Sequence, residues 1–184
     1  AHEGINGQIS IPDARMEEFK ASCDELEFMR GTRHNIAIDD DGKSFFKLKI
    51  TVRKKIVADG LDDSSFDVTN SGTHLSALEM NTMLASKDTV VVDMRNHYES
   101  EVGHFEGAIR PDVETFRESL PIISDMLADN KDKNIVMYCT GGIRCEKASA
   151  YMKHKGYENV FQLDGGIIEY ARQVKEQELE NKFL

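Results

Sequence analysis

The sequence predicts an α/β protein, a doubly wound parallel sheet that follows a smaller α+β unit. The sheet is predicted by three short apolar runs, residues 89–93, 134–138 and 159–163, which alternate with stretches of helical pattern. Continuous apolar runs of this length are typical of strands buried on both faces, and their alternation with helices indicates βαβ units. The smaller unit is predicted by alternating apolar and polar residues within residues 1–58.

Composition excludes several classes of protein. The chain has 184 residues, 40% of them hydrophobic, which is enough for one large domain or two small ones with a real core. No run approaches the roughly 18 apolar residues of a membrane span, so no membrane partner is expected. Three cysteines are an odd number and argue against a disulfide framework. They favour a reducing compartment, and we expect the cytoplasm.

The first unit, residues 1–58, contains one clear helical pattern. Residues 4–11 alternate as a strand interrupted by a turn, and Pro12-Asp13-Ala14 then begins a helix. Five residues spaced along one face of that helix are interpreted as its core side, and Cys23 among them as a core residue without chemistry. These residues are Met16, Phe19, Cys23, Leu26 and Met29.

Two more strands are predicted in this unit, at residues 35–38 and at residues 45–58, and the second is rich in basic residues. One interpretation is a solvated sheet face or an edge protected by lysines. The other is a strip that follows the phosphates of a nucleic acid. Residues 1–58 have a net charge of zero, whereas the remainder carries the whole −10. The basic residues are Lys43, Lys47, Lys49, Arg53, Lys54 and Lys55.

Residues 59–75 are polar and rich in turn formers, and we expect them to be a linker. The second unit, residues 76–178, begins with a capping-box pattern of Ser76 and Glu79 that opens a helix to about residue 85. Residues 112–128 are predicted to be helical, with Pro121 marking a break or the start of a second helix. Residues 179–184 form a short tail.

The strand at residues 134–138 leads directly into Cys139, and a helix is predicted from residue 146 to 155. A cysteine between a strand and a helix N-terminus lies where backbone N–H groups converge on an anion, which lowers the pKa of its thiol. Ligands of parallel sheets bind at the carboxyl ends of the strands. Cys139 is therefore the candidate reactive residue. A last helix is predicted from residue 167 to about residue 180.

Residues 76–178 resemble the rhodanese domain, because five separated motifs occur in its order. They are Asp93-x-Arg95, Tyr98-Glu99, Gly103-His104-Phe105-Glu106-Gly107-Ala108, Cys139-x4-Arg144 and Asp164-Gly165-Gly166. The resemblance implies that Cys139 acts as a nucleophile or carries a persulfide, and that Arg144 stabilises its charge. It also implies an active-site loop formed by Thr140, Gly141, Gly142, Ile143 and Cys145. The related phosphatases use a Cys-x5-Arg loop, one residue longer, so phosphate chemistry is disfavoured.

A second resemblance covers both units. The run from Cys139 to Ala148, and Glu3-Gly4-Ile5-Asn6-Gly7 near the start, are similar to the bacterial tRNA uridine 5-hydroxylase family. That family modifies the wobble uridine 34 of tRNA with molecular oxygen as co-substrate. The resemblance implies tRNA as partner, a ferredoxin-like first domain with a truncated first strand, and the absence of the cysteine-rich tail that many members carry. It also turns the basic strip into a candidate tRNA surface.

Alternatives remain at the level of sequence. A rhodanese-type sulfurtransferase that forms a persulfide on Cys139, or a binding module without activity, would contain the same loop. Cys145 is either a resolving thiol or a supporting residue. Asp93 and Arg95 are expected to form a structural ion pair, and His104 to fix its loop. No metal-ligand spacing and no nucleotide or flavin loop is present, so no metal, bound cofactor or protein partner is expected.

Overall fold

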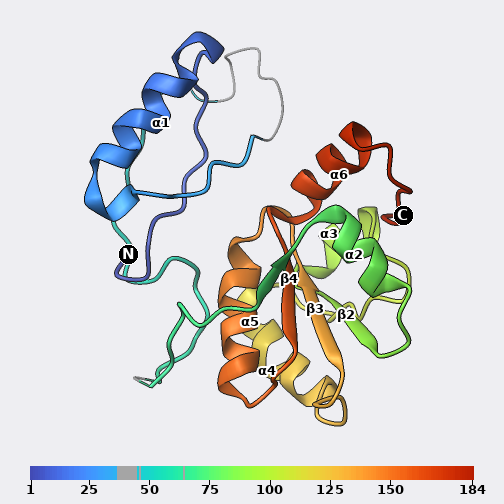
Figure 1. The fold of residues 1–184 in the computed structure, drawn as a ribbon. Coiled ribbons are helices and arrows are strands. Elements are labelled where there is room, and N and C mark those ends of the chain that lie inside the picture. The colour runs from blue at the N-terminus through green and yellow to red at the C-terminus, as the bar shows by residue number, and fades with distance from the viewer. Residues whose placement is uncertain (37–44, 46, 64) are drawn as a thin grey trace.

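The structure is a computed structural model that describes residues 1–36, 45, 47–63 and 65–184. Its centre is a four-stranded parallel sheet in the order β1-β4-β3-β2 (Figure 1). Three of its strands are the predicted apolar runs, with β4 one residue shorter than expected. Parallel strands buried on both faces need continuous apolar sequence, which explains why they were predictable. The strands are β1 Thr73–Leu75, β2 Thr89–Asp93, β3 Asn134–Tyr138 and β4 Val160–Leu163.

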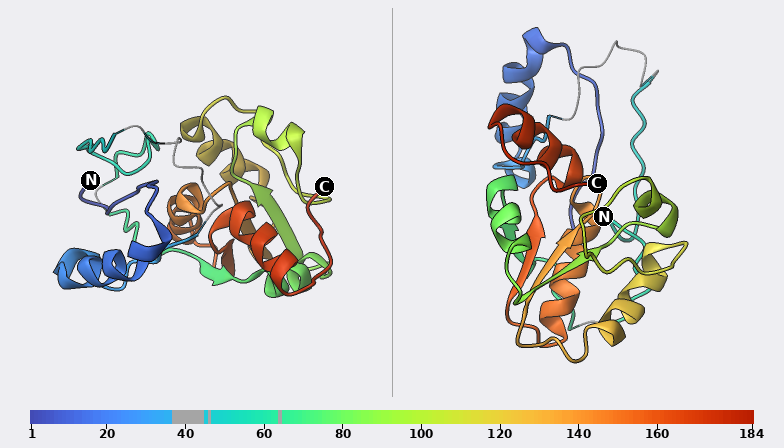
Figure 2. Two further views of the ribbon diagram at one scale, coloured as in Figure 1. Left: turned by 90° about the horizontal axis from the view of Figure 1, so that it is seen from above. Right: turned by 90° about the vertical axis from the view of Figure 1, so that its right-hand side faces the viewer.

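Helices cover both faces of the sheet, which confirms the doubly wound α/β class (Figure 2). Side chains of α4 and α5 pack with one face of the sheet, and side chains of α2 and α6 pack with the other. The short α3 lies between β2 and α4 in sequence and was not predicted. The helices are α2 Ala77–Leu84, α3 His97–Val102, α4 Phe116–Met126, α5 Ile143–His154 and α6 Gly166–Glu176.

Helix boundaries confirm some predicted signals and correct others. Ser76 and Glu79 form the predicted capping box at the start of α2. Pro121 lies inside α4 and does not end it, contrary to the prediction. A proline removes one hydrogen bond from a helix, and packing of the apolar face can offset that loss. Indeed Leu120 and Ile123, on either side of Pro121, are buried in the core.

The N-terminal region differs most from expectation. A helix forms there, α1 Met16–Glu25, between the 3-10 turns η1 Asp13–Arg15 and η2 Glu27–Met29. Of its predicted core face, Cys23 is buried, whereas Leu26 follows the helix and is exposed. The predicted strands at residues 4–11 and 45–58 are absent from the described residues there. Residues 37–38 of the strand predicted at residues 35–38 lie outside the described residues, and residues 35–36 form no strand.

The physical reason for the missing strands is the lack of a partner. A strand is stable when a neighbour completes its hydrogen-bond ladder and covers one face. The apolar residues of the 45–58 segment that should be covered are solvent-exposed instead, with Leu48 at 78%, Ile50 at 82% and Val52 at 91% exposure. An alternating sequence therefore did not suffice to form this strand.

Residues 59–75 do more than connect two units. Leu61 and Phe66 pack against the core on the α4 and α5 side, and residues 73–75 form the edge strand β1. The predicted domain limits at residues 58, 75 and 178 stay a prediction. None of the helices in the described part of the chain has the length and apolar character needed to cross a bilayer.

Candidate active site

The reactive loop begins where β3 ends. Each of β2, β3 and β4 runs parallel to its neighbour, and the register pairs Asp93 with Tyr138 at the carboxyl ends of β2 and β3. Cys139 follows Tyr138 directly, as predicted, and α5 begins only four residues later at Ile143. The predicted start of this helix at residue 146 was too late. The earlier start brings Arg144 and Cys145 into the first turn of α5, close to Cys139.

Gly142 closes the loop over the sulfur of Cys139. Its backbone has a φ of +95°, a conformation that favours glycine because it has no Cβ. In this conformation the Gly142 N–H donates a hydrogen bond of 3.1 Å to Cys139 Sγ. The side chain of Cys139 is fully buried.

The surroundings of Cys139 stabilise a thiolate. Its pKa is lowered from 9.0 to about 6, first by a hydrogen bond from the Cys145 thiol, and further by the charge of Arg144 and by the Cys145 and Gly142 N–H groups. Burial acts in the opposite direction and is outweighed. The pKa of Cys145 is raised, mainly by burial and also by the charge of Cys139, so Cys145 remains a thiol that donates.

Arg144 is held beside the loop by a carboxylate. Its guanidinium donates to both oxygens of Glu99, at 2.7 and 2.9 Å, and to Thr140 Oγ1 at 3.0 Å. Thr140 Oγ1 in turn donates to Glu99 Oε1 at 2.9 Å. The Arg144 guanidinium lowers the pKa of Glu99 to about 2. Arg144 therefore acts on Cys139 as a nearby charge with a fixed position.

Glu99 belongs to the site, although the sequence alone identifies it only as part of the Tyr98-Glu99 motif. It sits in α3, where its carboxylate also accepts the backbone N–H of Asn96 at 3.2 Å and completes a capping box. The Tyr98-Glu99 pair was the available signal. Its role could not be assigned, because Arg144 lies 45 residues further along the chain.

The ion pair expected between Asp93 and Arg95 is present and buried, with 2.6 Å between Nη2 and Oδ2. Tyr138 donates its hydroxyl to Asp93 Oδ2 at 2.7 Å, and Arg95 donates to the Gly103 carbonyl at 2.5 Å. These bonds tie the ends of β2 and β3 together beneath the loop. The Nδ1 atom of His104 lies 3.0 Å from the Ser100 carbonyl oxygen, within the same corner.

Most residues of the basic strip lie at the surface. Lys47, Lys49, Arg53 and Lys54 are exposed, although they do not lie on a strand. Lys55 differs, because its ammonium donates to Asp59 Oδ1 at 2.7 Å and to the Leu61 carbonyl. Lys43 lies outside the described residues. The nucleic-acid role of the strip stays a prediction.

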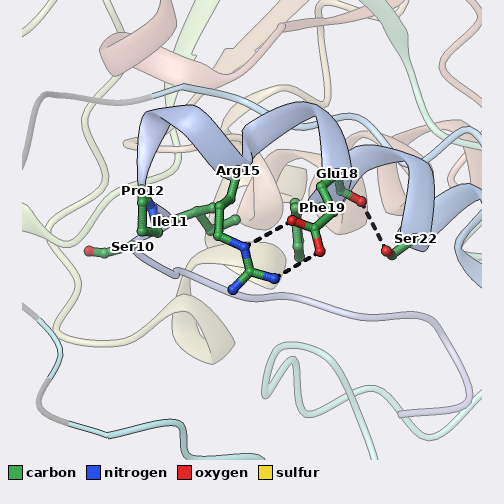
Figure 3. A pocket seen from close by; sticks show the side chains of 7 residues that line it. All are labelled: Ser10, Ile11, Pro12, Arg15, Glu18, Phe19 and Ser22. Atoms are coloured by element: carbon green, nitrogen blue, oxygen red, sulfur yellow. Dashed lines mark hydrogen bonds and ion pairs between the residues drawn. The ribbon is translucent and has the colours of Figure 1, made fainter.

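A hollow beside α1 lies away from the reactive loop. It has a volume of about 300 Å³, and two of its lining residues, Arg15 and Glu18, form two hydrogen bonds with each other (Figure 3). None of the predicted site residues lines it. Its lining residues are Ser10, Ile11, Pro12, Arg15, Glu18, Phe19 and Ser22.

Comparison with known proteins follows the same division of the chain. Residues 76–173 match the family described as the rhodanese-like domain, and residues 1–56 match the family described as a UPF0176 acylphosphatase-like domain. The first match covers more than half of the sequence. The chain therefore belongs to the rhodanese-like domain family, and the fold class expected from sequence is confirmed.

Curated proteins that match the whole chain indicate a narrower group within this family. The whole chain is 58% identical to the tRNA uridine(34) hydroxylase of Photorhabdus laumondii and 56% identical to that of Escherichia coli strain SE11. Each match covers 53% of the relative, so the chain spans about half the length of the curated proteins it matches. The resemblance that the two sequence motifs indicated is thus confirmed.

One solved structure is also similar. It is a protein of unknown function from Rhodopseudomonas palustris, described as a possible tyrosine phosphatase, with a TM-score of 0.49 and 24% sequence identity. The match covers 57% of this chain and 83% of that one.

Proposed function

We propose that this chain forms the part of a tRNA-modifying enzyme that contains the reactive cysteine for 5-hydroxylation of uridine 34. The observation that carries the proposal is the 58% identity, which extends through the N-terminal region and the rhodanese-like domain together. In this proposal tRNA is the substrate, molecular oxygen is the co-substrate, and the reaction takes place in the cytoplasm. The stabilised thiolate of Cys139 also supports the proposal, because a thiolate is the nucleophilic form of cysteine.

Cys139 is the nucleophile in this proposal. A thiolate that adds to C6 of uracil breaks the C5–C6 double bond and places enolate character on C5, the carbon that becomes hydroxylated. The Gly142 N–H and the Cys145 thiol stabilise the sulfur anion before the attack and after its release. Because Cys139 is fully buried, binding of the uridine requires that residues around the loop move.

The test is nucleoside mass spectrometry of tRNA from a strain that lacks the gene. The complete gene is returned as wild type, as Cys139→Ser or as Cys23→Ser, the last a control because Cys23 is buried in α1. We expect 5-hydroxyuridine with the wild type and with Cys23→Ser, and none with Cys139→Ser. Full modification with Cys139→Ser would remove the cysteine from the mechanism, and none with the wild type would refute the function.

A second candidate is sulfur transfer, which the same thiolate favours. Cys139 at a pKa of about 6 is ionised at neutral pH and could attack the outer sulfur of thiosulfate, forming a persulfide and releasing sulfite. Intact mass after incubation would then increase by one sulfur atom, and added cyanide would remove it as thiocyanate. An unchanged mass in wild type, with Cys139→Ser as the reference, would reject this candidate.

A further inference from the structure

A buried ion cluster joins the start of the chain to the helix that follows the reactive loop. Lys147, in the first half of α5, has a fully buried ammonium that lies 2.7 and 2.8 Å from the two carboxylate oxygens of Glu3. The same ammonium lies 2.7 Å from Oδ2 of Asp59, whose side chain is also fully buried. Glu3 and Lys147 each belong to one of the two motifs shared with the hydroxylase family. These motifs therefore meet in space.

The carboxylates of this cluster have further partners that fix their positions. Glu3 Oε2 accepts the backbone N–H of Ile56 at 2.8 Å. Asp59 Oδ1 accepts the ammonium of Lys55 at 2.7 Å and the backbone N–H of Leu61 at 2.9 Å. Two ammonium groups thus face two carboxylates, and the cluster as a whole is neutral. Two segments that precede β1, one at Glu3 and one at residues 55–61, therefore converge on one side chain of α5.

The preceding residue of α5 repeats this arrangement. Glu146 lies 2.7 Å from Arg33 Nη2 and 2.7 Å from His74 Nε2, and it accepts from Gln162 at 3.1 Å. Arg33 also pairs with Asp164 in the loop after β4. That loop continues into Ile167, whose N–H donates to the Cys139 carbonyl at 2.9 Å. Residues before β2 therefore hold both sides of the reactive loop.

Buried ion clusters contribute little net stability, because desolvation offsets the attraction between the charges. Removal of one partner is nevertheless costly, since the other charge remains buried without compensation. Such a cluster therefore selects one arrangement of the segments that it joins. Here those segments are the N-terminal region and the helix that contains Arg144 and Cys145.

We propose that Lys147 is a positioning residue, whose ion pairs with Glu3 and Asp59 hold the first turn of α5 against the sulfur of Cys139. It acts through the backbone of α5, since the groups that act most strongly on Cys139 are Cys145, Arg144 and Gly142 and not the charges of the cluster. Cys145 and Arg144 precede Lys147 by two and three residues in the same helix. The proposal concerns the thiolate and holds whichever reaction Cys139 performs.

The test measures the thiolate of Cys139 directly. Its ultraviolet absorbance is followed against pH in the 184-residue chain, and the signal of the matching Cys139→Ser variant is subtracted. In Lys147→Met, which keeps the length of the side chain and removes its charge, we expect the midpoint to rise by about one pH unit, roughly the loss of one hydrogen bond to a charged group. Because no tRNA or oxygen is involved, failure of the hydroxylase proposal would leave this result unaffected.

Two further variants keep the test decisive. Lys153→Met lies on the same helix, and its ammonium contacts the Ser71 carbonyl at 3.3 Å, so we expect the wild-type midpoint. Glu3→Gln removes one carboxylate and leaves Lys147 beside Asp59, so this variant decides if Lys147→Met does not fold. A wild-type midpoint in a folded Lys147→Met would overturn the proposal. So would a wild-type midpoint in Glu3→Gln if that variant decides, or an equal rise in Lys153→Met.

Discussion

At the scale of single residues, Cys145 is best described as a donor to the reactive sulfur. Its thiol hydrogen bond is the largest influence that lowers the pKa of Cys139. Cys145→Ala should therefore raise the midpoint of the Cys139 thiolate above its value of about 6, by about one to two pH units. Thiolate absorbance against pH measures this change. Cys145→Ser retains a donor and should restore most of it.

If the Cys139 thiolate has the same midpoint in Cys145→Ala as in wild type, Cys145 is only a packing residue. The alternative role as a resolving thiol makes a different demand, because it requires a sulfur atom. In that case Cys145→Ser would behave like Cys145→Ala in any assay of recovery from peroxide. The two substitutions therefore separate donation of a hydrogen bond from disulfide chemistry.

Glu99 should make folding stability depend on pH. Its pKa falls from 4.5 to about 2 in the folded state, so the folded state binds fewer protons between these values than the unfolded state. The contribution of Glu99 is present above pH 4.5 and is lost as the pH falls toward 2. Urea unfolding should show Glu99→Gln less stable than wild type at about pH 7, with a difference that shrinks at about pH 3.

The control for this measurement is Glu101→Gln, at an exposed position of the same helix. We expect it to follow the wild type at both pH values. If Glu99→Gln kept the same stability difference at neutral and at acidic pH, the bond from Arg144 to the Glu99 carboxylate would not be the source of stability.

The residues of the loop could be predicted from sequence, but their partners could not. Cys139 was predictable because a buried strand, a glycine turn and a helix start are all local signals. Glu99 and Lys147 were not, because their partners lie 45 and 144 residues away in the chain. Only the fold brings α3, the N-terminal segment and α5 to the same place.

At the scale of elements, the turn into α6 packs tightly against the reactive loop. Gly166 has a φ of +66°, and a Cβ on it would lie 2.5 Å from the carbonyl oxygens of Cys139 and Thr140. Gly166→Ala should therefore destabilise the fold by at least about 1–3 kcal/mol, from backbone strain and steric overlap. Urea unfolding measures this loss, and the thiolate titration of Cys139 should shift with it.

Two glycines serve as controls for this prediction. A methyl group added to Gly141 would have no other atom within 4 Å, and its φ is not positive, so Gly141→Ala should be nearly neutral. Gly156 has a φ of +87° in open space, so Gly156→Ala contains strain without overlap. A loss in Gly166→Ala no larger than that in Gly156→Ala would mean that contact with the loop contributes nothing.

Elements were predictable where the local pattern had one interpretation. The apolar runs of β2, β3 and β4 and the capping box of α2 belong to this group. The helix α3 has only six residues and no long apolar face, so its sequence contained little periodic signal. The predicted break at Pro121 was wrong because burial of the neighbouring apolar residues, a property of the fold, stabilises α4 across it.

At the scale of the molecule, we expect the exposed basic residues of the N-terminal region to contact tRNA phosphates. Joint substitution of Lys47, Lys49, Arg53 and Lys54 by alanine should weaken tRNA binding. It should also reduce the slope of log affinity against log salt, by roughly 0.7–0.9 for each phosphate that the protein no longer neutralises. Binding measured at several salt concentrations provides both quantities.

The control removes positive charge near the amino end of β3. Lys131 and Lys133 precede β3, whereas the reactive loop follows it, so their replacement by alanine should leave the slope unchanged. A slope that is equal in the two sets of variants would argue against a tRNA surface in the N-terminal region.

The whole molecule was predictable in its second half and less so in its first. A parallel sheet covered by helices on both faces is encoded by apolar runs that can be buried in only one way. The alternation at residues 45–58 predicted a half-buried strand, yet burial depends on what lies opposite, and Leu48, Ile50 and Val52 are exposed. A sequence pattern identifies the apolar face of a segment, but only the folded structure determines whether another element covers that face.

The contact between Glu3 and Lys147 also sets the order in which parts of the chain can pack during translation. The two residues are separated by 144 positions. At a translation rate of about 5–20 residues per second, Lys147 is therefore synthesised roughly 7–30 s after Glu3. During this interval the carboxylates of Glu3 and Asp59 remain in water without the ammonium of Lys147. The segment that contains Glu3 can therefore pack against α5 only after α5 has emerged from the ribosome.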